Sequence, residues 1–453
     1  MKKLWEKQEN ALTSAVEAFT VGQDRIWDLH LAPFDVLGSI AHVTMLSEAG
    51  LLPETDADTL IQGLREIHRE ILAGHFILEE GVEDVHSQVE LLLTRRFGDA
   101  GKKIHMARSR NDQVLVDLRL FLRDEILKTV QSTRRLFDLL QEQSERYQDR
   151  LMPGYTHLQL AMPSSFGLWF GAYAESLVDD LVTLRGAFDV VDRNPLGSAA
   201  GFGSSFPINR SRTTELLGFS GLSYNVVYAQ MGRGKSERIT AMALANLADT
   251  LSRLSMDACL FLNQNFDFIG FPAELTTGSS IMPHKKNPDV FELIRSRCNR
   301  LKALPNEILM MTTNLPSGYH RDLQILKEHL FPAFNELQSC LDMALLMLSR
   351  IEVKPDLLDD SKYRYLFSVE EVNRRVLAGM TFRDAYREVG LEIEEGRFEA
   401  RPEQLKHTHE GSMGRLCTGE VRNRMLSVIE GFPGKKVADA LQALVQSNPQ
   451  RQA

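Results

Sequence analysis

Residues 102–152 read KKIHMARSRNDQVLVDLRLFLRDEILKTVQSTRRLFDLLQEQSERYQDRLM, a stretch with no glycine and no proline. Apolar side chains recur along it at steps of three, four or seven residues, and the stripe comprises Leu115, Leu118, Leu122, Ile126, Val130, Phe137 and Leu140. This spacing predicts one long helix with a single apolar face. Ser109, Asn111 and Asp112 stand at its expected start, where short polar side chains cap free backbone N–H groups. Because so long a helix does not fit a small globule, the stretch predicts a helical bundle.

The rest of the chain continues the helical pattern. A second run without glycine or proline spans 235–269, and shorter helical patterns cover 164–191, 288–304, 323–349 and 382–389. No run of alternating apolar and polar residues is convincing as a strand. We therefore expect an all-α fold.

Breaks in the pattern suggest how the chain is divided. The two largest clusters of glycine, serine and proline, at 193–207 and 270–288, are expected to be loops. We expect three parts, which are an N-terminal helical domain (1–108), a central long-helix bundle domain (109–350) and a small C-terminal helical domain (351–453).

Composition narrows the class of protein and its compartment. The 453 residues include 61 acidic and 52 basic side chains, a formal charge of −9, which argues against general nucleic-acid binding. The four cysteines form no CxxC pair, and the N-terminal MKKLWEKQEN lacks the apolar segment of a signal peptide. Residues 151–174 are uncharged and long enough to cross a bilayer, but their prolines and polar groups favour a buried segment. We expect a cytoplasmic protein that binds neither nucleic acid nor membrane.

The most informative loop is 278–288, GSSIMPHKKNP. Its residue types suit removal of a weakly acidic proton next to a carboxylate, with a hydroxyl as base and with Lys285 and Asn287 holding the developing negative charge. Its glycine would let the loop close over a substrate. By composition alone, a solvated polar loop is the more ordinary interpretation.

Two other clusters add weight to the chemical interpretation. Residues 108–113, RSRNDQ, place two arginines and an amide at a helix N-terminus, where carboxylates bind well. Residues 154–159, GYTHLQ, place His157 among small polar residues in the uncharged stretch. A lone histidine in such a place is more often a core residue than a catalyst, so that alternative stays open.

Together these segments resemble a known family. GSSIMPHKKNP resembles the signature loop of the fumarase/aspartase superfamily, whose members eliminate fumarate from succinyl-type substrates, and SRNDQ and GYTHLQ resemble its argininosuccinate lyase branch. Further agreement at 38–42, 84–87, 205–210, 236–238 and 382–385 spreads the similarity over nearly the whole chain. The resemblance implies a three-domain, all-α subunit whose long central helices form the core of a homotetramer. It also implies active sites that each draw residues from three subunits.

The reaction implied by the resemblance is β-elimination of argininosuccinate to arginine and fumarate, in arginine biosynthesis, without a metal or an organic cofactor. Ser279 would remove the Cβ proton, and Lys285 and Asn287 would stabilise the aci-carboxylate intermediate. His157, oriented by Glu292, would assist acid–base chemistry or protonate the departing guanidino nitrogen.

The resemblance also implies two groups of binding residues. The residues that would bind the succinyl carboxylates are Ser109, Arg110, Asn111 and Thr156, with His86 nearby. Tyr319, Gln324 and Lys327 would hold the amino-acid end of the substrate.

Two single positions and one segment depart from the family pattern. His284 replaces the usual glutamine before the signature lysine, as in adenylosuccinate lyases, and Asp24 stands where a serine is expected. The segment 319–327, YHRDLQILK, keeps its tyrosine, aspartate, glutamine and lysine but loses an asparagine and an acidic pair. These departures affect the far end of the substrate rather than proton removal.

Two alternatives therefore accompany the first hypothesis. One is another succinyl-adduct lyase, such as an adenylosuccinate lyase, which His284 favours. The other is a non-catalytic structural relative, which would be expected to tolerate loss of the base or of the histidine.

Overall fold

The computed structural model describes residues 14–402, 405 and 407–446. Its longest element is helix α7 (Arg110–Arg146), so the long helix predicted from the glycine-free stretch is confirmed. Ser109 caps it, since its side chain accepts the backbone N–H of Asn111 and its own N–H donates to the Asp112 carboxylate. With 37 residues and a rise of 1.5 Å per residue, α7 is about 55 Å long.

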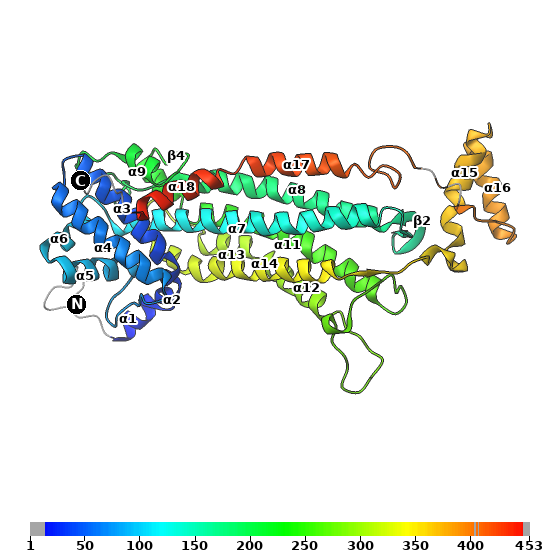
Figure 1. Cartoon of the computed structure of the whole chain (residues 1–453), viewed down its shortest axis with the longest axis horizontal. Coiled ribbons are helices and arrows are strands. Elements are labelled where there is room, and N and C mark those ends of the chain that lie inside the picture. Colours follow the sequence, from blue (N-terminus) through cyan, green and yellow to red (C-terminus); the bar gives the residue numbers. More distant parts are fainter. Residues whose placement is uncertain (1–13, 403–404, 406, 447–453) are drawn as a thin grey trace.

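The bundle consists of α7 and five further helices, which are α8 (Phe166–Val191), α11 (Lys235–Leu262), α12 (Asp289–Leu301), α13 (Leu304–Met311) and α14 (Leu326–Ser349) (Figure 1). Helix α7 packs directly on α8 and α14, and α11 packs on the other four helices. Their shared core includes several side chains buried to below 2% exposure, among them Phe137, Phe166, Phe170, Phe188 and Phe291. Because the facing stripes of these helices are apolar, burial drives their association. The predicted all-α class is confirmed.

A second core lies at one end of the bundle, where the chain begins in Figure 1. The helices there are α1 (Ser14–Val21), α2 (Asp24–Asp28), α3 (Ala32–Glu48), α4 (Glu54–Leu72), α5 (Val85–Phe97) and α6 (Asp99–Lys102). The segment Asp24–Glu48 has the length and apolar composition of a membrane span, yet 78% of its most apolar window is buried inside the chain. A helix in the core of a globular domain has the same properties.

The C-terminal residues are distributed over the length of the molecule (Figure 1). Helices α15 (Ser368–Leu377) and α16 (Phe382–Glu394) pack on each other at the far end of the bundle. Helix α17 (Thr418–Glu430) returns along α8, and α18 (Gly434–Val445) packs on α3 and on α9 (Arg210–Leu216). The division at residues 108 and 350 remains a proposal.

The expectation of no strands was wrong, because the described residues contain three two-stranded pairings. Two of these pairings have only two residues per strand, namely β3 (Arg193–Asn194) with β4 (Gly221–Leu222) and β5 (Ile269–Gly270) with β6 (Glu352–Val353). Strands β1 (Leu151–Thr156) and β2 (Gln159–Ser165) form an antiparallel hairpin in the uncharged stretch that follows α7. His157 and Leu158 form its turn with φ angles of 55° and 57°. The strand pattern is weak in the sequence because the hairpin is short and its register is interrupted between Pro153 and Tyr155.

Candidate active site

A cavity of about 180 Å³ lies where the N-terminal helices meet the start of α7 and the start of α14. Of the predicted substrate-binding residues, those that line it are His86, Arg110, Asn111, Tyr319, Gln324 and Lys327. Ser109 lies next to this cavity as the cap of α7. The fold thus brings most of the predicted binding residues together within one chain, although they are spread over more than 200 positions of sequence.

Lys327, in the first turn of α14, lies between two carboxylates at this cavity. Its Nζ atom is 2.8 Å from Oδ1 of Asp24 and 2.8 Å from Oδ1 of Asp28. The Lys327 side chain is 3% exposed; burial alone would lower its pKa, but the two aspartates outweigh burial and raise it. The other oxygen of Asp28 accepts the backbone N–H of Val85 at 2.8 Å, which ties α2 to the start of α5.

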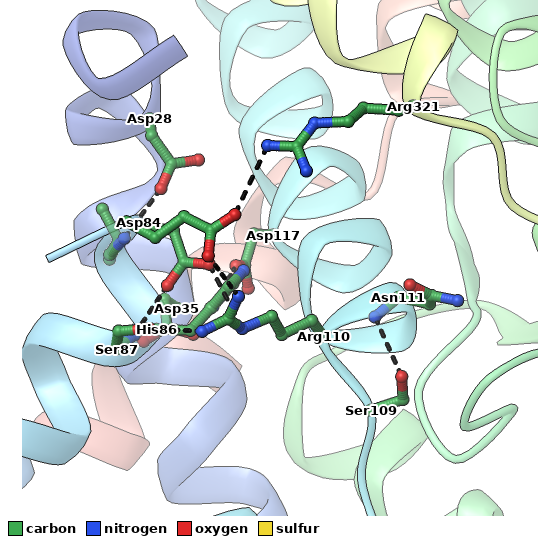
Figure 2. A network of polar contacts seen from close by, with 12 residues as sticks. Asp28, Asp35, Asp84, His86, Ser87, Ser109, Arg110, Asn111, Asp117 and Arg321 are labelled. Carbon is green, nitrogen blue, oxygen red and sulfur yellow. Dashed lines mark hydrogen bonds and ion pairs between the residues drawn. The ribbon is translucent and has the colours of Figure 1, made fainter. Parts of the chain in front are cut away.

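His86, in the first turn of α5, is held by buried carboxylates, as Figure 2 shows. Its Nδ1 atom is 2.7 Å from Oδ1 of Asp35 and 3.7 Å from Oδ2 of Asp117. Burial opposes protonation of the ring, but these aspartates outweigh burial and raise the pKa of His86 to about 10. His86 is therefore an imidazolium at neutral pH, and its second ring nitrogen remains to interact with a ligand anion.

The same three side chains are also close enough to hold a metal ion, because one ligand atom from each lies within 4.8 Å of the others. The 2.7 Å contact between His86 and Asp35 has the length of a charge-assisted hydrogen bond. Burial raises the pKa of Asp117 well above its ordinary value, and Asp35 adds to this effect. A charge-assisted ion pair between His86 and Asp35, with Asp117 beside it, accounts for these contacts without a metal ion.

Arg110, at the first position of α7, is positioned by three neighbours (Figure 2). Its guanidinium donates to Glu83 at 3.0 Å and to Ser87 at 2.7 Å, and its Nε lies 3.3 Å from Asp84. Arg108, its neighbour in the RSRNDQ cluster, is buried and donates instead to Ser39 and to the carbonyl of Ile104. Arg110 is therefore the arginine of this cluster that lines the cavity.

Thr156 and His157 lie far from this cavity. Both are exposed at the hairpin turn, which follows the opposite end of α7. The 37 residues of α7 separate the hairpin from Ser109 by about 55 Å. The alternative of a core histidine is therefore wrong, because the ring of His157 lies at the surface of the chain.

The signature loop 278–288 lies before α12 and projects away from the bundle (Figure 1). Its base is closed by backbone pairing between Thr277 and Asn287, whose amide also donates to the carbonyl of Gly278 at 3.2 Å. Ser279 Oγ accepts the backbone N–H groups of Ile281 at 3.4 Å and of Met282 at 3.1 Å. Donors of this kind stabilise negative charge on oxygen, which suits a hydroxyl that must lose its proton.

The two remaining predicted residues of this region, Lys285 and Glu292, are exposed. The predicted catalytic residues thus lie in two exposed segments, the loop with its following helix and the hairpin. The predicted binding residues lie mainly in the cavity. A single chain does not bring these three groups together.

The sequence interpretation missed Asp28 and Arg233, which line the cavity, and noted Asp24 only as a departure from the family pattern. It also missed Asp35 and Asp117, which lie behind the cavity and hold His86. One signal was available, since Asp24 and Asp28 are four residues apart and therefore share one face of a helix. The partners of His86 come from α3 and α7, and no local pattern indicates that pairing.

Comparison with known proteins identifies the family of the chain. A family model described as "Lyase" matches residues 3–302. An argininosuccinate lyase of Parabacteroides distasonis is 60% identical over 444 residues, covering 98% of this chain and 99% of that protein. An argininosuccinate lyase of Bacteroides fragilis is 60% identical over 431 residues, covering 95% of this chain and 96% of that protein.

Solved structures share the fold at low identity. An EDDS lyase in complex with formate has a TM-score of 0.78 at 23% identity, covering 96% of this chain and 95% of that chain. A class II fumarase of Schistosoma mansoni has a TM-score of 0.70 at 15% identity, covering 94% of this chain and 96% of that chain. Fold and site together define an all-α lyase of the fumarase/aspartase type. The chain belongs to this superfamily and, within it, to the argininosuccinate lyase family.

Proposed function

We propose that this protein is an argininosuccinate lyase that splits argininosuccinate into arginine and fumarate in the cytoplasm, as a step of arginine biosynthesis. The observation that carries the proposal is the 60% identity to argininosuccinate lyases over 98% of the chain. The cavity supports it, since cationic groups at the start of α7 and on α5 suit a substrate rich in carboxylates.

The proposed reaction needs the chain's own acid–base groups and neither a metal nor an organic cofactor. Ser279 removes a proton from the Cβ atom of the succinyl group, and Lys285 and Asn287 stabilise the negative charge that develops on the adjacent carboxylate. The electron pair left by the Cβ–H bond then forms the double bond of fumarate. The C–N bond breaks with its own electron pair leaving on the guanidino nitrogen, which His157, oriented by Glu292, protonates. Ser109, Arg110, Asn111 and Thr156 bind the succinyl carboxylates, with His86 beside them.

We propose that the active enzyme is a homotetramer with shared active sites. The separation of about 55 Å along α7 supports this, because His157 and Ser109 of one chain lie too far apart to contact one substrate. Exposed apolar side chains on the central helices support it as well, and they include Met242, Met256, Leu293, Met310 and Met343. Packing these surfaces against other copies would bury them.

Two other functions are less well supported. His284 favours an adenylosuccinate lyase, but the closely similar proteins named above are argininosuccinate lyases. A non-catalytic relative would be expected to lose catalytic side chains, whereas Ser279, His157, Lys285 and Asn287 are all present.

The test is to incubate the purified full-length protein with argininosuccinate and, separately, with adenylosuccinate, and to measure fumarate by its ultraviolet absorbance. Argininosuccinate should give fumarate and equimolar arginine. Fumarate from adenylosuccinate alone would replace the proposal with the alternative lyase, and no fumarate from either would support the non-catalytic relative.

A further inference from the structure

Glu83, in the loop directly before α5, contacts two arginines, Arg110 and Arg321, which line the cavity and are shown in Figure 2. Its Oε2 atom accepts a hydrogen bond from Nη1 of Arg110 at 3.0 Å. Its Oε1 atom accepts from Nη2 of Arg321 at 3.4 Å. Arg110 begins α7, whereas Arg321 lies in the short turn before α14, so one carboxylate joins two segments that are far apart in the sequence.

The positive charge of Arg110 is already compensated by the chain itself. Besides Glu83, its guanidinium faces Asp84, with Nε 3.3 Å from Oδ2, and its Nη2 atom donates to Oγ of Ser87 at 2.7 Å. Burial lowers the pKa of Arg110, but Asp84 and Glu83 outweigh burial and raise it. Because one cation faces two carboxylates, a carboxylate of a ligand gains little attraction from Arg110 until one of them moves away.

The two carboxylates differ in how they are held. Asp84 caps α5, since its Oδ1 atom accepts the backbone N–H of Ser87 at 2.8 Å, so its position is fixed by the helix. Within the described part of the chain, the carboxylate of Glu83 is held by the two arginines alone. Glu83 is therefore the carboxylate that can move.

Arg321 is placed to receive Glu83. Its Nη2 atom also donates to the carbonyl of Thr20 at 3.0 Å, which anchors the guanidinium beside the cavity. The side chain of Arg321 is 52% exposed, so it can adjust to a second oxygen of the glutamate without repacking a core. Since one oxygen of Glu83 already contacts Arg321, the transfer breaks only the hydrogen bond to Arg110.

We propose that Glu83 is an internal counter-ion of Arg110 that a carboxylate of the substrate displaces, and that Arg321 holds Glu83 once it is displaced. Arg110 then faces the carboxylate of the substrate and Asp84, while Glu83 pairs with Arg321, so no charge loses its partner. Competition between two carboxylates for one guanidinium sets the affinity of the site. Glu83 contacts no reacting atom in this arrangement, so it acts on binding and not on the rate of the chemical step. This inference rests on the proposed function, because it takes Arg110 as the residue that binds a succinyl carboxylate.

The test is a double-mutant cycle on the full-length enzyme, assayed by release of fumarate from argininosuccinate. Glu83→Gln removes the competing charge at nearly constant size, so KM should fall by at least about threefold with kcat nearly unchanged. Arg321→Gln leaves Glu83 with Arg110 alone, so KM should rise by at least about threefold. When Glu83→Gln is already present no competitor remains, and adding Arg321→Gln should change KM by less than about twofold.

A purely structural role of Glu83 predicts the opposite sign. If Glu83 only held Arg110 in place, Glu83→Gln would raise KM, and either that result or an unchanged KM would overturn the inference. An equal effect of Arg321→Gln in the wild type and in Glu83→Gln would overturn it as well, because the two residues would then act independently. If Glu83→Gln did not fold, Arg321→Gln at its exposed position would decide by itself, since an unchanged KM would contradict competition for Arg110.

A matched control removes an acid of the same loop that lies outside the cavity. Glu80 is exposed and is not among the residues that line the cavity. Glu80→Gln changes the net charge of the chain by the same amount as Glu83→Gln, and it should leave KM unchanged. A decrease in KM as large as that of Glu83→Gln would mean that overall charge, and not competition for Arg110, controls binding.

Calorimetry with succinate separates this inference from the proposed function, because it measures binding of a dicarboxylate without turnover. Glu83→Gln should bind succinate at least about threefold more tightly than the wild type does. If the wild type released no fumarate from argininosuccinate but Glu83→Gln showed this tighter binding, the proposed reaction would fail while the inference would hold. If fumarate were released but Glu83→Gln bound succinate no more tightly than the wild type, the inference would fail while the reaction would stand.

Discussion

The cavity beside α2 and the signature loop 278–288 hold their charged side chains in different ways. At the cavity, Lys327 and His86 are buried, and each contacts two carboxylates within 4 Å. In the loop, Lys285 is exposed, and within the described part of the chain the Ser279 hydroxyl hydrogen-bonds only with backbone N–H groups of its own loop. In the proposed mechanism, the binding groups would be set in place when one chain folds, whereas the proton-transfer groups would reach working geometry through loop closure and assembly.

The largest expected effect concerns the loop. Ser279→Ala should lower kcat by about 10³-fold or more, because a positioned general base contributes 10² to 10⁴. Since the loop takes little part in the core, the oligomeric state, thermal stability and binding of argininosuccinate should persist. Steady-state release of fumarate measures the change. A decrease of less than about tenfold, equivalent to about 1.4 kcal/mol of barrier, would mean that serine is not the base.

The second largest effect is expected at the cavity, where loss of Lys327 should lower the stability of the folded protein. Lys327→Met removes the cation that Asp24 and Asp28 share, and an unpaired buried carboxylate typically costs about 3–5 kcal/mol. Urea denaturation should therefore show a large decrease in the free energy of unfolding. Lys102→Met, which removes an exposed ion pair with Asp99, is the control and should leave stability unchanged. If the two variants were equally stable, the buried ion pairs of Lys327 with the two aspartates would not contribute measurably to folding.

His157→Asn tests the hairpin and should affect rate without affecting stability. We expect kcat to fall by about 10²-fold, the lower range for loss of an acid–base group. Because His157 is exposed at a turn, the melting temperature should stay the same. Near-normal kcat would remove His157 from the proposed mechanism and would confine proton transfer to the signature loop.

The smallest expected effect is a change in how the free energy of unfolding varies with pH. In the folded chain the pKa of His86 is about 10, against 6.5 ordinarily, so between these values only the folded state binds this proton. The stability that it contributes is present below pH 6.5 and is lost as pH rises towards 10, by up to about 1.4 kcal/mol per pH unit. His86→Gln should remove that slope from urea denaturation at pH 7, 8 and 9. His75 is exposed, so the control variant His75→Gln should retain the slope of the wild type. The same slope in the wild type and in both variants would contradict the raised pKa of His86.

Prediction from the sequence succeeded where the signal is local. The apolar stripe of α7 and the cap at Ser109 are set by residues three or four positions apart, and both are present in the structure. The segments 278–288, 108–113 and 154–159 could be singled out because their residue types are chemically suggestive in any fold. The β1–β2 hairpin was missed because its strands are short and their pairing includes two prolines.

The sequence by itself therefore determined the class of fold, the family and the identity of the chemical groups. Each of these follows from residues that lie close together in the sequence. Tertiary structure decided how those groups are charged and where they meet. Asp35 and Asp117 reach His86 from α3 and α7, and Asp24 reaches Lys327 across about 300 residues of chain. The reason is physical, because the pKa of a buried group depends on every charge within a few ångströms, whatever its position in the sequence.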